Sequence, residues 1–196
     1  IKFPKVTQVL DSQQTLISVD DDDSLTFVKN TEVTAMVFDG NGANKHIQMA
    51  SDSTTLNLSE GTGDMSFTFA FWINVTALPG VGTTDFIFSK YDSFQGYDCA
   101  ITANGDIRVR LHKSSTASNE FVSPLSFSGA EHILEGEAGN WVQICMVYTP
   151  NTGVNTNRMV FYKNGSVFGA AVFVENASYN AGGGMSNTTA PFVIGN

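Results

Sequence analysis

The hydrophobic and polar positions of this chain follow the two-residue period of β-strands. Along Ser66–Val75 the apolar side chains that point one way are Phe67, Phe69, Phe71, Ile73 and Val75, and we assign them to a core. The same alternation along 106–112 turns Ile107, Val109 and Leu111 inward and leaves Arg108, Arg110 and His112 together on the opposite face. No stretch keeps a helical period for more than about two turns. The pattern therefore predicts an all-β protein.

Two turn signals predict how neighbouring strands pair. Asn-Gly occurs at 104–105 and again at 164–165, each time between two runs of alternating apolar residues. This dipeptide suits the tight turns of two-residue β-hairpins. Four longer turn-rich stretches interrupt the pattern at 50–64, 76–84, 113–139 and 175–190, and within the third we expect SPLSFSGAEHILEGEAG (123–139) to form a short strand or turn. We expect a largely antiparallel fold with recognition on its longer loops.

Seven stretches carry a resemblance to a known family. In chain order they are TAMVFDGNGANKHIQM (34–49), MSFTFAFWINV (65–75), FIFSKYD (86–92), GYDCAITANGDIRVRL (96–111), NWVQICMVY (140–148), RMVFYKNGSVFGAAV (158–172) and PFVIGN (191–196). Together they resemble the laminin-G-like (LamG) branch of the concanavalin A-like lectin/glucanase superfamily over about 33–196. The resemblance implies an antiparallel two-sheet β-sandwich of jelly-roll type. It also implies a binding module, since glycosidases are a minority in this fold.

The ends of the chain differ from that pattern. We interpret residues 1–32 as an N-terminal arm or linker that includes short strands, followed by the sandwich at 33–196. The acidic run Asp20–Asp23 predicts a solvated turn, with a calcium loop as the alternative. The family usually adds a strand after its last matched stretch, so we expect the closing strand to be missing or replaced. The chain begins without Met or a leader, so we expect a portion of a longer protein.

Composition and charge narrow the function classes. The chain has 196 residues and a formal net charge of −9, and its 10 Lys and Arg residues are scattered. A nucleic-acid partner needs clustered cations, and an anionic membrane surface repels this charge. No apolar run is long enough to span a bilayer. We therefore expect a glycan or a protein surface as the partner, with no nucleic acid and no membrane span.

The motifs of catalysis are missing from the sequence. Superfamily glycosidases carry their acids on one strand as E-x-D-x-E, and the nearest approach is Glu135-Gly136-Glu137 in a Gly-rich loop. There is no G-x-S-x-G, H-E-x-x-H or phosphate-binding loop. His46, His112 and His132 lie far apart in sequence. We predict that the protein is not an enzyme.

Calcium is the one cofactor with some support, through the resemblance. Many laminin-G-like sandwiches hold Ca²⁺ on carboxylates and backbone carbonyls, and Asp39 in FDGNG matches an early family Asp. The alternative is that Asp39 caps the turn through its own backbone. Cys99 and Cys145 lie inside strand patterns, and we interpret them as buried thiols with a disulfide as the alternative.

A polar and aromatic set marks a candidate ligand site. Its members flank the turn of SKYDSFQGYD or line one strand face: Tyr91, Asp92, Tyr97, Arg108, Arg110 and His112. On adjacent strands they could form a wall for a ligand, and the alternative is a plain solvated sheet face. Trp72, Trp141 and Tyr148 we assign instead to structural packing.

These observations predict a non-catalytic recognition module of a larger protein, for glycan binding or adhesion at a cell surface. The alternative is a structural domain that assembles or decorates a virion, a tail fibre or a surface layer, docked through the N-terminal arm. Either role places the protein outside cells, on a cell surface or on a virion. Fold by itself does not choose between them.

Overall fold

The computed structural model describes residues 8–10, 16–19, 26–29, 34–38, 46–49, 56–59, 63–114, 117–125, 131–150, 159–174 and 184–195. These ranges contain fifteen strands and no helix. The strands are β1 (Gln8–Leu10), β2 (Leu16–Val19), β3 (Thr26–Lys29), β4 (Thr34–Val37), β5 (Ile47–Met49), β6 (Phe67–Asn74), β7 (Thr84–Asp92), β8 (Gln95–Thr102), β9 (Ile107–Ser114), β10 (Ala117–Val122), β11 (Trp141–Tyr148), β12 (Met159–Lys163), β13 (Ser166–Ala170), β14 (Val172–Val174) and β15 (Val193–Ile194).

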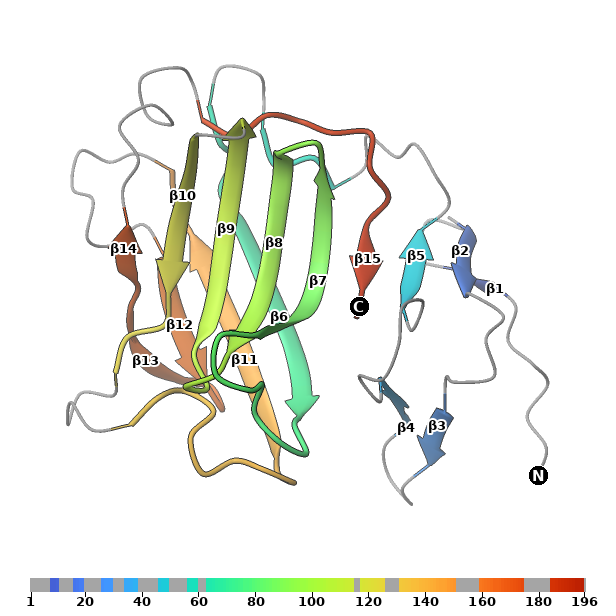
Figure 1. The fold of residues 1–196 in the computed structure, drawn as a ribbon, viewed down its shortest axis with the longest axis vertical. Helices are drawn as coiled ribbons and strands as arrows, with labels where there is room; N and C mark the ends of the chain where they lie inside the picture. Colours follow the sequence, from blue (N-terminus) through green and yellow to red (C-terminus); the bar gives the residue numbers. More distant parts are fainter. Residues whose placement is uncertain are drawn as a thin grey trace.

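Two antiparallel sheets form the sandwich. The larger has the strand order β1-β2-β5-β15-β7-β8-β9-β10-β14, and the smaller has the order β13-β12-β11-β6. In Figure 1 strands β7 to β10 stand in front, and β6, β11, β12 and β13 pass behind them. A separate pair joins β3 to β4. The predicted all-β, two-sheet antiparallel sandwich is confirmed.

The core lies between the sheets and is built by the predicted alternation. Ile107, Val109 and Leu111 of β9 are fully buried, and the odd-numbered residues Phe67, Phe69, Phe71 and Ile73 of β6 pack against the same cluster. Aromatic rings dominate this interface; Phe67 stacks on Tyr148 of β11 with ring centroids 4.8 Å apart. Because the core takes every second side chain, the alternate residues of the same strands are left on the two outer faces.

Both predicted Asn-Gly hairpins are present. Asn164 and Gly165 join β12 to β13 with φ of 51° and 79°, the left-handed backbone that a type I′ turn requires. The turn at 103–106 joins β8 to β9, and there the Gly105 N–H donates to the Thr102 carbonyl at 2.9 Å. A third hairpin, at Ser93 and Phe94 between β7 and β8, carries no Asn-Gly signal and lies within the turn expected in SKYDSFQGYD.

The stretch 113–139 is more structured than predicted. Strand β10 occupies its first part and pairs with β9 and β14. Its inward side chains include Ala117, Asn119 and Phe121, so a small and an amide residue replace the large apolar residues that usually signal a strand. The expected short strand or turn was placed at 123–139, so the strand at Ala117–Val122 was missed, and β10 becomes part of the sheet face described below.

The ends of the chain enter the larger sheet. Within 1–32, β2 pairs with β5 and β1 pairs with β2, and near the other end β15 lies between β5 and β7. The strand predicted in PFVIGN is thus confirmed as β15. The boundary at 32–33 and the identity of a closing strand stay predictions, and Asp20–Asp23 lie outside the described residues. The described residues include no helix long and apolar enough to cross a membrane.

The segment 184–190 crosses the ends of β8 and β9 and fixes them. The Ser186 N–H donates to the His112 carbonyl at 3.1 Å, and the Ser186 carbonyl accepts from the Gly96 N–H at 3.0 Å. Asp64 anchors the start of this segment, because its carboxylate accepts from the Met185 N–H at 2.6 Å and from the Tyr148 hydroxyl at 2.8 Å. These bonds hold the end of β9 where the candidate site lies.

Candidate functional site

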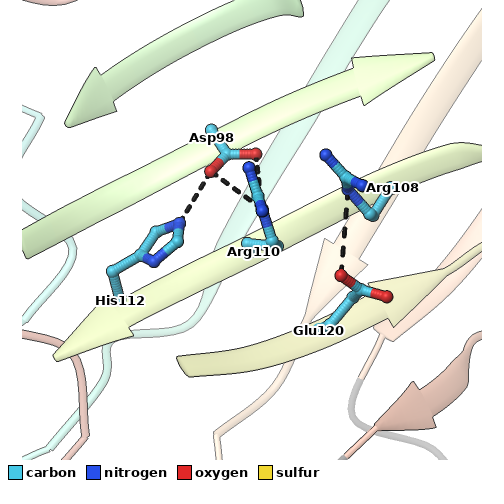
Figure 2. Close-up of polar contacts among 5 residues, drawn as sticks. All are labelled: Asp98, Arg108, Arg110, His112 and Glu120. Atoms are coloured by element: carbon cyan, nitrogen blue, oxygen red, sulfur yellow. Dashed lines mark hydrogen bonds and ion pairs between the residues drawn. The ribbon is translucent and has the colours of Figure 1, made fainter. Parts of the chain in front are cut away.

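A charged cluster occupies the outer face of the larger sheet, on β8, β9 and β10. The β8–β9 turn sets a register in which Asp98 pairs with Arg110 and Ala100 pairs with Arg108. In the next pair of strands, Glu120 lies opposite Arg110. Figure 2 shows the five side chains Asp98, Arg108, Arg110, His112 and Glu120 gathered on this face. The alternation that buries Cys99 and Val109 in the core leaves these polar groups outside.

Asp98 is the centre of the cluster. The Arg110 Nε donates to both Asp98 carboxylate oxygens at 3.1 Å, and His112 Nε2 lies 2.7 Å from Asp98 Oδ2 (Figure 2). A carboxylate only accepts, so the proton of this contact is on His112 Nε2. The Asp98 side chain is 3% exposed. A buried carboxylate needs partners of this kind, because an unpaired charge removed from water is strongly unfavourable.

Arg108 is held less tightly. Its Nε lies 3.8 Å from Glu120 Oε2, which is ion-pair distance and too long for a hydrogen bond. That Nε is buried and has no hydrogen-bond partner in the described part of the chain. Burying a guanidinium N–H without a partner is unfavourable, since the group loses its water and gains nothing in return. Arg108 is therefore the cation of the cluster that is held least firmly by the rest of the chain.

Aromatic side chains border the cluster at the β7–β8 hairpin. The Tyr91 ring packs against His112 with centroids 4.6 Å apart, and Phe94 meets Tyr91 edge-on at 6.4 Å. Ser93 and Phe94 have φ of 49° and 67°, a left-handed backbone that costs a non-glycine residue about 1–2 kcal/mol. The turn nevertheless carries a Phe that is 51% exposed. Strain that serves to present an apolar ring to solvent is a common mark of a binding loop.

Four of the six predicted site residues share this face: Tyr91, Arg108, Arg110 and His112. Asp92 lies at the exposed tip of the hairpin, where its Oδ1 accepts from the Ser93 hydroxyl at 3.0 Å. Tyr97 lies on the opposite face of β8, 1% exposed within the core, and its hydroxyl donates to the Leu56 carbonyl at 3.0 Å. Burial raises the pKa of Tyr97 well above its usual value. Its ring is thus not available to a ligand on the outer face.

Three residues of the site were missed from the sequence: Asp98, Glu120 and Phe94. A signal existed for Asp98, since counting outward from the Asn-Gly turn at 104–105 places it opposite Arg110. Glu120 was hidden because β10 was taken for a loop. Phe94 had no signal, because Ser-Phe is not a dipeptide that favours a left-handed turn.

Three other acidic groups near this sheet, Asp106, Glu135 and Glu137, have structural partners. Asp106 Oδ1 lies 2.8 Å from His132 Nδ1 and accepts from the Ser123 hydroxyl at 3.4 Å, which fastens the 131–135 segment to the β8–β9 turn. Because Ser123 contacts the carboxylate and not the imidazole, this is not the arrangement of a serine nucleophile and its base. Glu135 accepts from the His132 N–H at 3.0 Å, and Glu137 lies 2.7 Å from Lys163 Nζ.

Two further expectations concern calcium and the cysteines. Asp39 lies outside the described residues, and the ranges that are described hold no group of three or more His, Cys, Asp or Glu suited to a metal ion. Calcium therefore stays a prediction. Cys99 and Cys145 are both free thiols, on β8 and β11 of different sheets. Cys99 is buried as predicted, and burial raises its pKa, with a further contribution from the Asp98 charge. Cys145 is half-buried on an outer face.

Comparisons with known proteins agree with this architecture. The binding domain of Paraclostridial Mosquitocidal Protein 1 matches with a TM-score of 0.65 at 16% identity, covering 95% of this chain and 41% of that chain. The receptor binding domain of botulinum neurotoxin D matches with a TM-score of 0.57 at 16% identity, covering 95% and 41%. A structure of botulinum neurotoxin type C, whose cell entry depends on interaction with two ganglioside molecules, matches with a TM-score of 0.54 at 14% identity, covering 94% and 38%.

At these identities the likeness is one of fold, and this chain spans less than half the length of each of the three. No curated protein matches the sequence. A family model does match, over residues 39–196, and its description is the concanavalin A-like lectin/glucanases superfamily. That range contains every strand from β5 to β15 and both faces of the sandwich. The chain therefore belongs to the concanavalin A-like lectin/glucanase superfamily.

Proposed function

We propose that this domain is a non-catalytic recognition module that binds a cell-surface glycan through the outer face of β7 to β10. The observation that carries the proposal is the Asp98-centred cluster beside an exposed aromatic hairpin. Arg110 and His112 are fixed by Asp98, while the terminal nitrogens of Arg108 and Arg110 donate no hydrogen bond within the described residues. Fixed guanidinium donors next to Tyr91 and Phe94 offer hydrogen bonds to hydroxyl or carboxylate oxygens and a ring surface for an apolar sugar face.

The arrangement of the acids supports binding over hydrolysis. A glycosidase needs two carboxylates that face one substrate bond from its two sides. On this face Asp98 and Glu120 each face a guanidinium group instead. Further support comes from the structural neighbours: two are binding domains, of a mosquitocidal protein and of botulinum neurotoxin D, and the third is a botulinum neurotoxin type C whose cell entry depends on two ganglioside molecules. Those neighbours are longer proteins, so a glycan ligand for this chain is a proposal.

A glycan array probed with the intact chain tests the proposal, followed by affinity measurements on two variants. We expect Arg108→Ala and Phe94→Ala each to weaken binding of the best glycan about tenfold or more, as truncation of Arg and aromatic anchors commonly does. Lys163→Ala is a matched control, because it removes a cation from the other sheet. Val81→Ala is the second control, since this fully exposed apolar side chain lies in the loop at the far end of β7. An array without binding across broad glycan classes would refute the proposal.

A further inference from the structure

The smaller sheet presents a second outer face of different character. Its register places one set of side chains in the core and leaves the alternate set outward. The outward set is Thr68, Ala70, Trp72 and Asn74 on β6, Trp141, Gln143, Cys145 and Val147 on β11, Val160 and Tyr162 on β12, and Val167 and Ala170 on β13. None of these residues is buried and none is charged. We call this surface the tryptophan face.

Both tryptophans of the chain lie on this face and both are exposed. Trp72 is 61% exposed and Trp141 is 41% exposed, although Trp is on average among the more buried residue types. Trp72 pairs with Gln143 and Trp141 pairs with Asn74, so the two indoles stand in diagonal positions on adjacent strands. Diagonal positions are roughly 7–8 Å apart, close enough for one ligand to cover both rings. Their exposure contradicts the expectation that these two residues serve structural packing.

Hydrogen-bonding groups stand between the rings. The Asn74 amide is oriented by its Nδ2, which donates to the Gly139 carbonyl at 2.8 Å. Within the described residues, the side-chain amide of Gln143 and the indole N–H groups of Trp72 and Trp141 make no hydrogen bond. The face therefore combines ring surface with uncharged donors and acceptors that a ligand can use in place of water.

The lack of charge decides which ligand fits. The chain carries a net charge of −9, but none of the outward residues of the tryptophan face is charged. An anionic ligand such as a nucleic acid, a phosphopeptide or a sialylated glycan would find no counter-charge here and would lose its hydration. A second copy of the chain is also a poor fit, because a stable protein interface takes roughly 20–30 residues a side, about twice what this face offers.

We propose that the tryptophan face binds an uncharged oligosaccharide. Such a ligand is amphipathic: its apolar C–H faces cover the two indoles, and its hydroxyl groups exchange hydrogen bonds with the Gln143 amide and the indole N–H groups. The face lies on the opposite side of the sandwich from the Asp98 cluster, since β6 and β11 pass behind β8 and β9 (Figure 1). The site is thus separate from the one proposed above and does not depend on it.

Tryptophan fluorescence is a direct probe, because both emitting residues lie in the proposed site. We would titrate the chain with maltohexaose, cellohexaose and N-acetylchitohexaose, together with sialyllactose as an anionic probe. We expect a saturable change of emission with at least one neutral oligosaccharide and none with sialyllactose. Emission that stays constant with all the neutral probes, or that responds to the anionic probe more strongly, would overturn the proposal. The proposal would also be overturned if the emission shifted with protein concentration and light scattering showed a dimer, because a second copy of the chain would then cover the face.

Variants separate this site from the first one. Measured by calorimetry, Trp72→Ala and Trp141→Ala should each weaken binding of the neutral oligosaccharide about tenfold or more. Val81→Ala, which truncates a fully exposed apolar residue outside the face, should leave affinity within about twofold. Arg108→Ala should leave the fluorescence titration unchanged. Loss of binding in Arg108→Ala with full binding in both tryptophan variants would refute this inference and leave the proposed function standing. The proposed function is refuted separately, by full affinity for its own glycan in both Arg108→Ala and Phe94→Ala.

Discussion

The buried carboxylate of Asp98 allows a sharp test of how the charged face is held together. Asp98→Asn keeps the shape of the side chain and removes its charge, so that Arg110 and His112 lose their anionic partner. Glu120→Gln makes the same chemical change on the same face. Glu120, however, is about one-third exposed and lies 3.8 Å from Arg108, beyond hydrogen-bond distance. The two substitutions therefore differ mainly in burial and in contact geometry.

The expected magnitudes follow from those contacts. Hydrogen bonds to a charged group contribute roughly 1.5–3 kcal/mol, and removing one member of a buried ion pair costs about 3–5 kcal/mol. Asn retains one acceptor, so we expect Asp98→Asn to lower the free energy of unfolding by about 2–3 kcal/mol and Asp98→Ala by about 3–5 kcal/mol. For a chain of this length that shifts the melting temperature of Asp98→Asn by roughly 4–12 °C. Glu120→Gln should stay within about 0.5 kcal/mol.

Urea unfolding curves of the wild type and the variants measure these differences. A double-mutant cycle of Asp98→Ala with Arg110→Ala isolates the pair, and we expect a coupling energy of more than about 1 kcal/mol. Equal stability of Asp98→Asn and Glu120→Gln would refute the reasoning. A cycle that is additive within about 0.5 kcal/mol would refute it as well, because contacts at 3.1 Å to both carboxylate oxygens would then contribute nothing measurable.

Three further predictions concern other parts of the fold. Gly96→Ala should unfold the chain or destabilise it by more than backbone strain alone, which costs about 1–3 kcal/mol, because the new Cβ would lie 1.9 Å from the Lys90 carbonyl oxygen. Gly82→Ala is the control in a melting assay, because Gly82 has a similar φ and its added Cβ would meet no atom within 4 Å. The contribution of Tyr97 to the free energy of unfolding should be fully present below its unfolded pKa of about 10 and should be lost as the pH rises toward its raised folded pKa. In urea unfolding at increasing pH, Tyr97→Phe should make this loss of stability smaller. If Asp39 holds calcium, a calcium concentration a hundred times Kd should stabilise the fold by about 2.7 kcal/mol, and Asp39→Asn should remove most of that stabilisation. A melting curve indifferent to calcium and EDTA would identify Asp39 as a turn residue.

The strands of the sandwich could largely be predicted because its core residues repeat every second position. In β6 and β9 the inward set is large and apolar, whereas the outward set is small or polar except for Trp72, and the structure confirms both inward assignments. Strand β10 could not be found in this way. Its inward positions Ala117 and Asn119 are small or polar, and they become buried because neighbouring strands and loops cover them. Burial of that kind depends on tertiary packing, which local periodicity does not contain.

The candidate site was predicted only in part, for two physical reasons. Arg108, Arg110 and His112 lie on one strand, so their common face follows from alternation alone. Placing Asp98 among them required the β8–β9 register, and placing Tyr97 required knowing which face of β8 is buried. Tyr97 was grouped with the surface residues because it is near the hairpin in sequence, but the odd positions of β8 point into the core. The alternation of inward and outward side chains along β8, and not closeness in sequence to the hairpin, determines which face Tyr97 occupies.

The alternation of inward and outward side chains also explains why one small domain can carry two chemically different faces. Each outward side chain of β6 and β11 stands between inward neighbours, so Trp72 can be truncated while Phe71 and Ile73 keep their places in the core. Substitutions on the tryptophan face should therefore change binding with little change in stability. Asp98 does not follow this rule, because it is an outward residue that its own ion-pair partners have buried. If binding is lost in Trp72→Ala with an unchanged melting curve, the face acts in recognition; if the melting temperature falls with it, the indole is packing against a part of the protein and the face is not free.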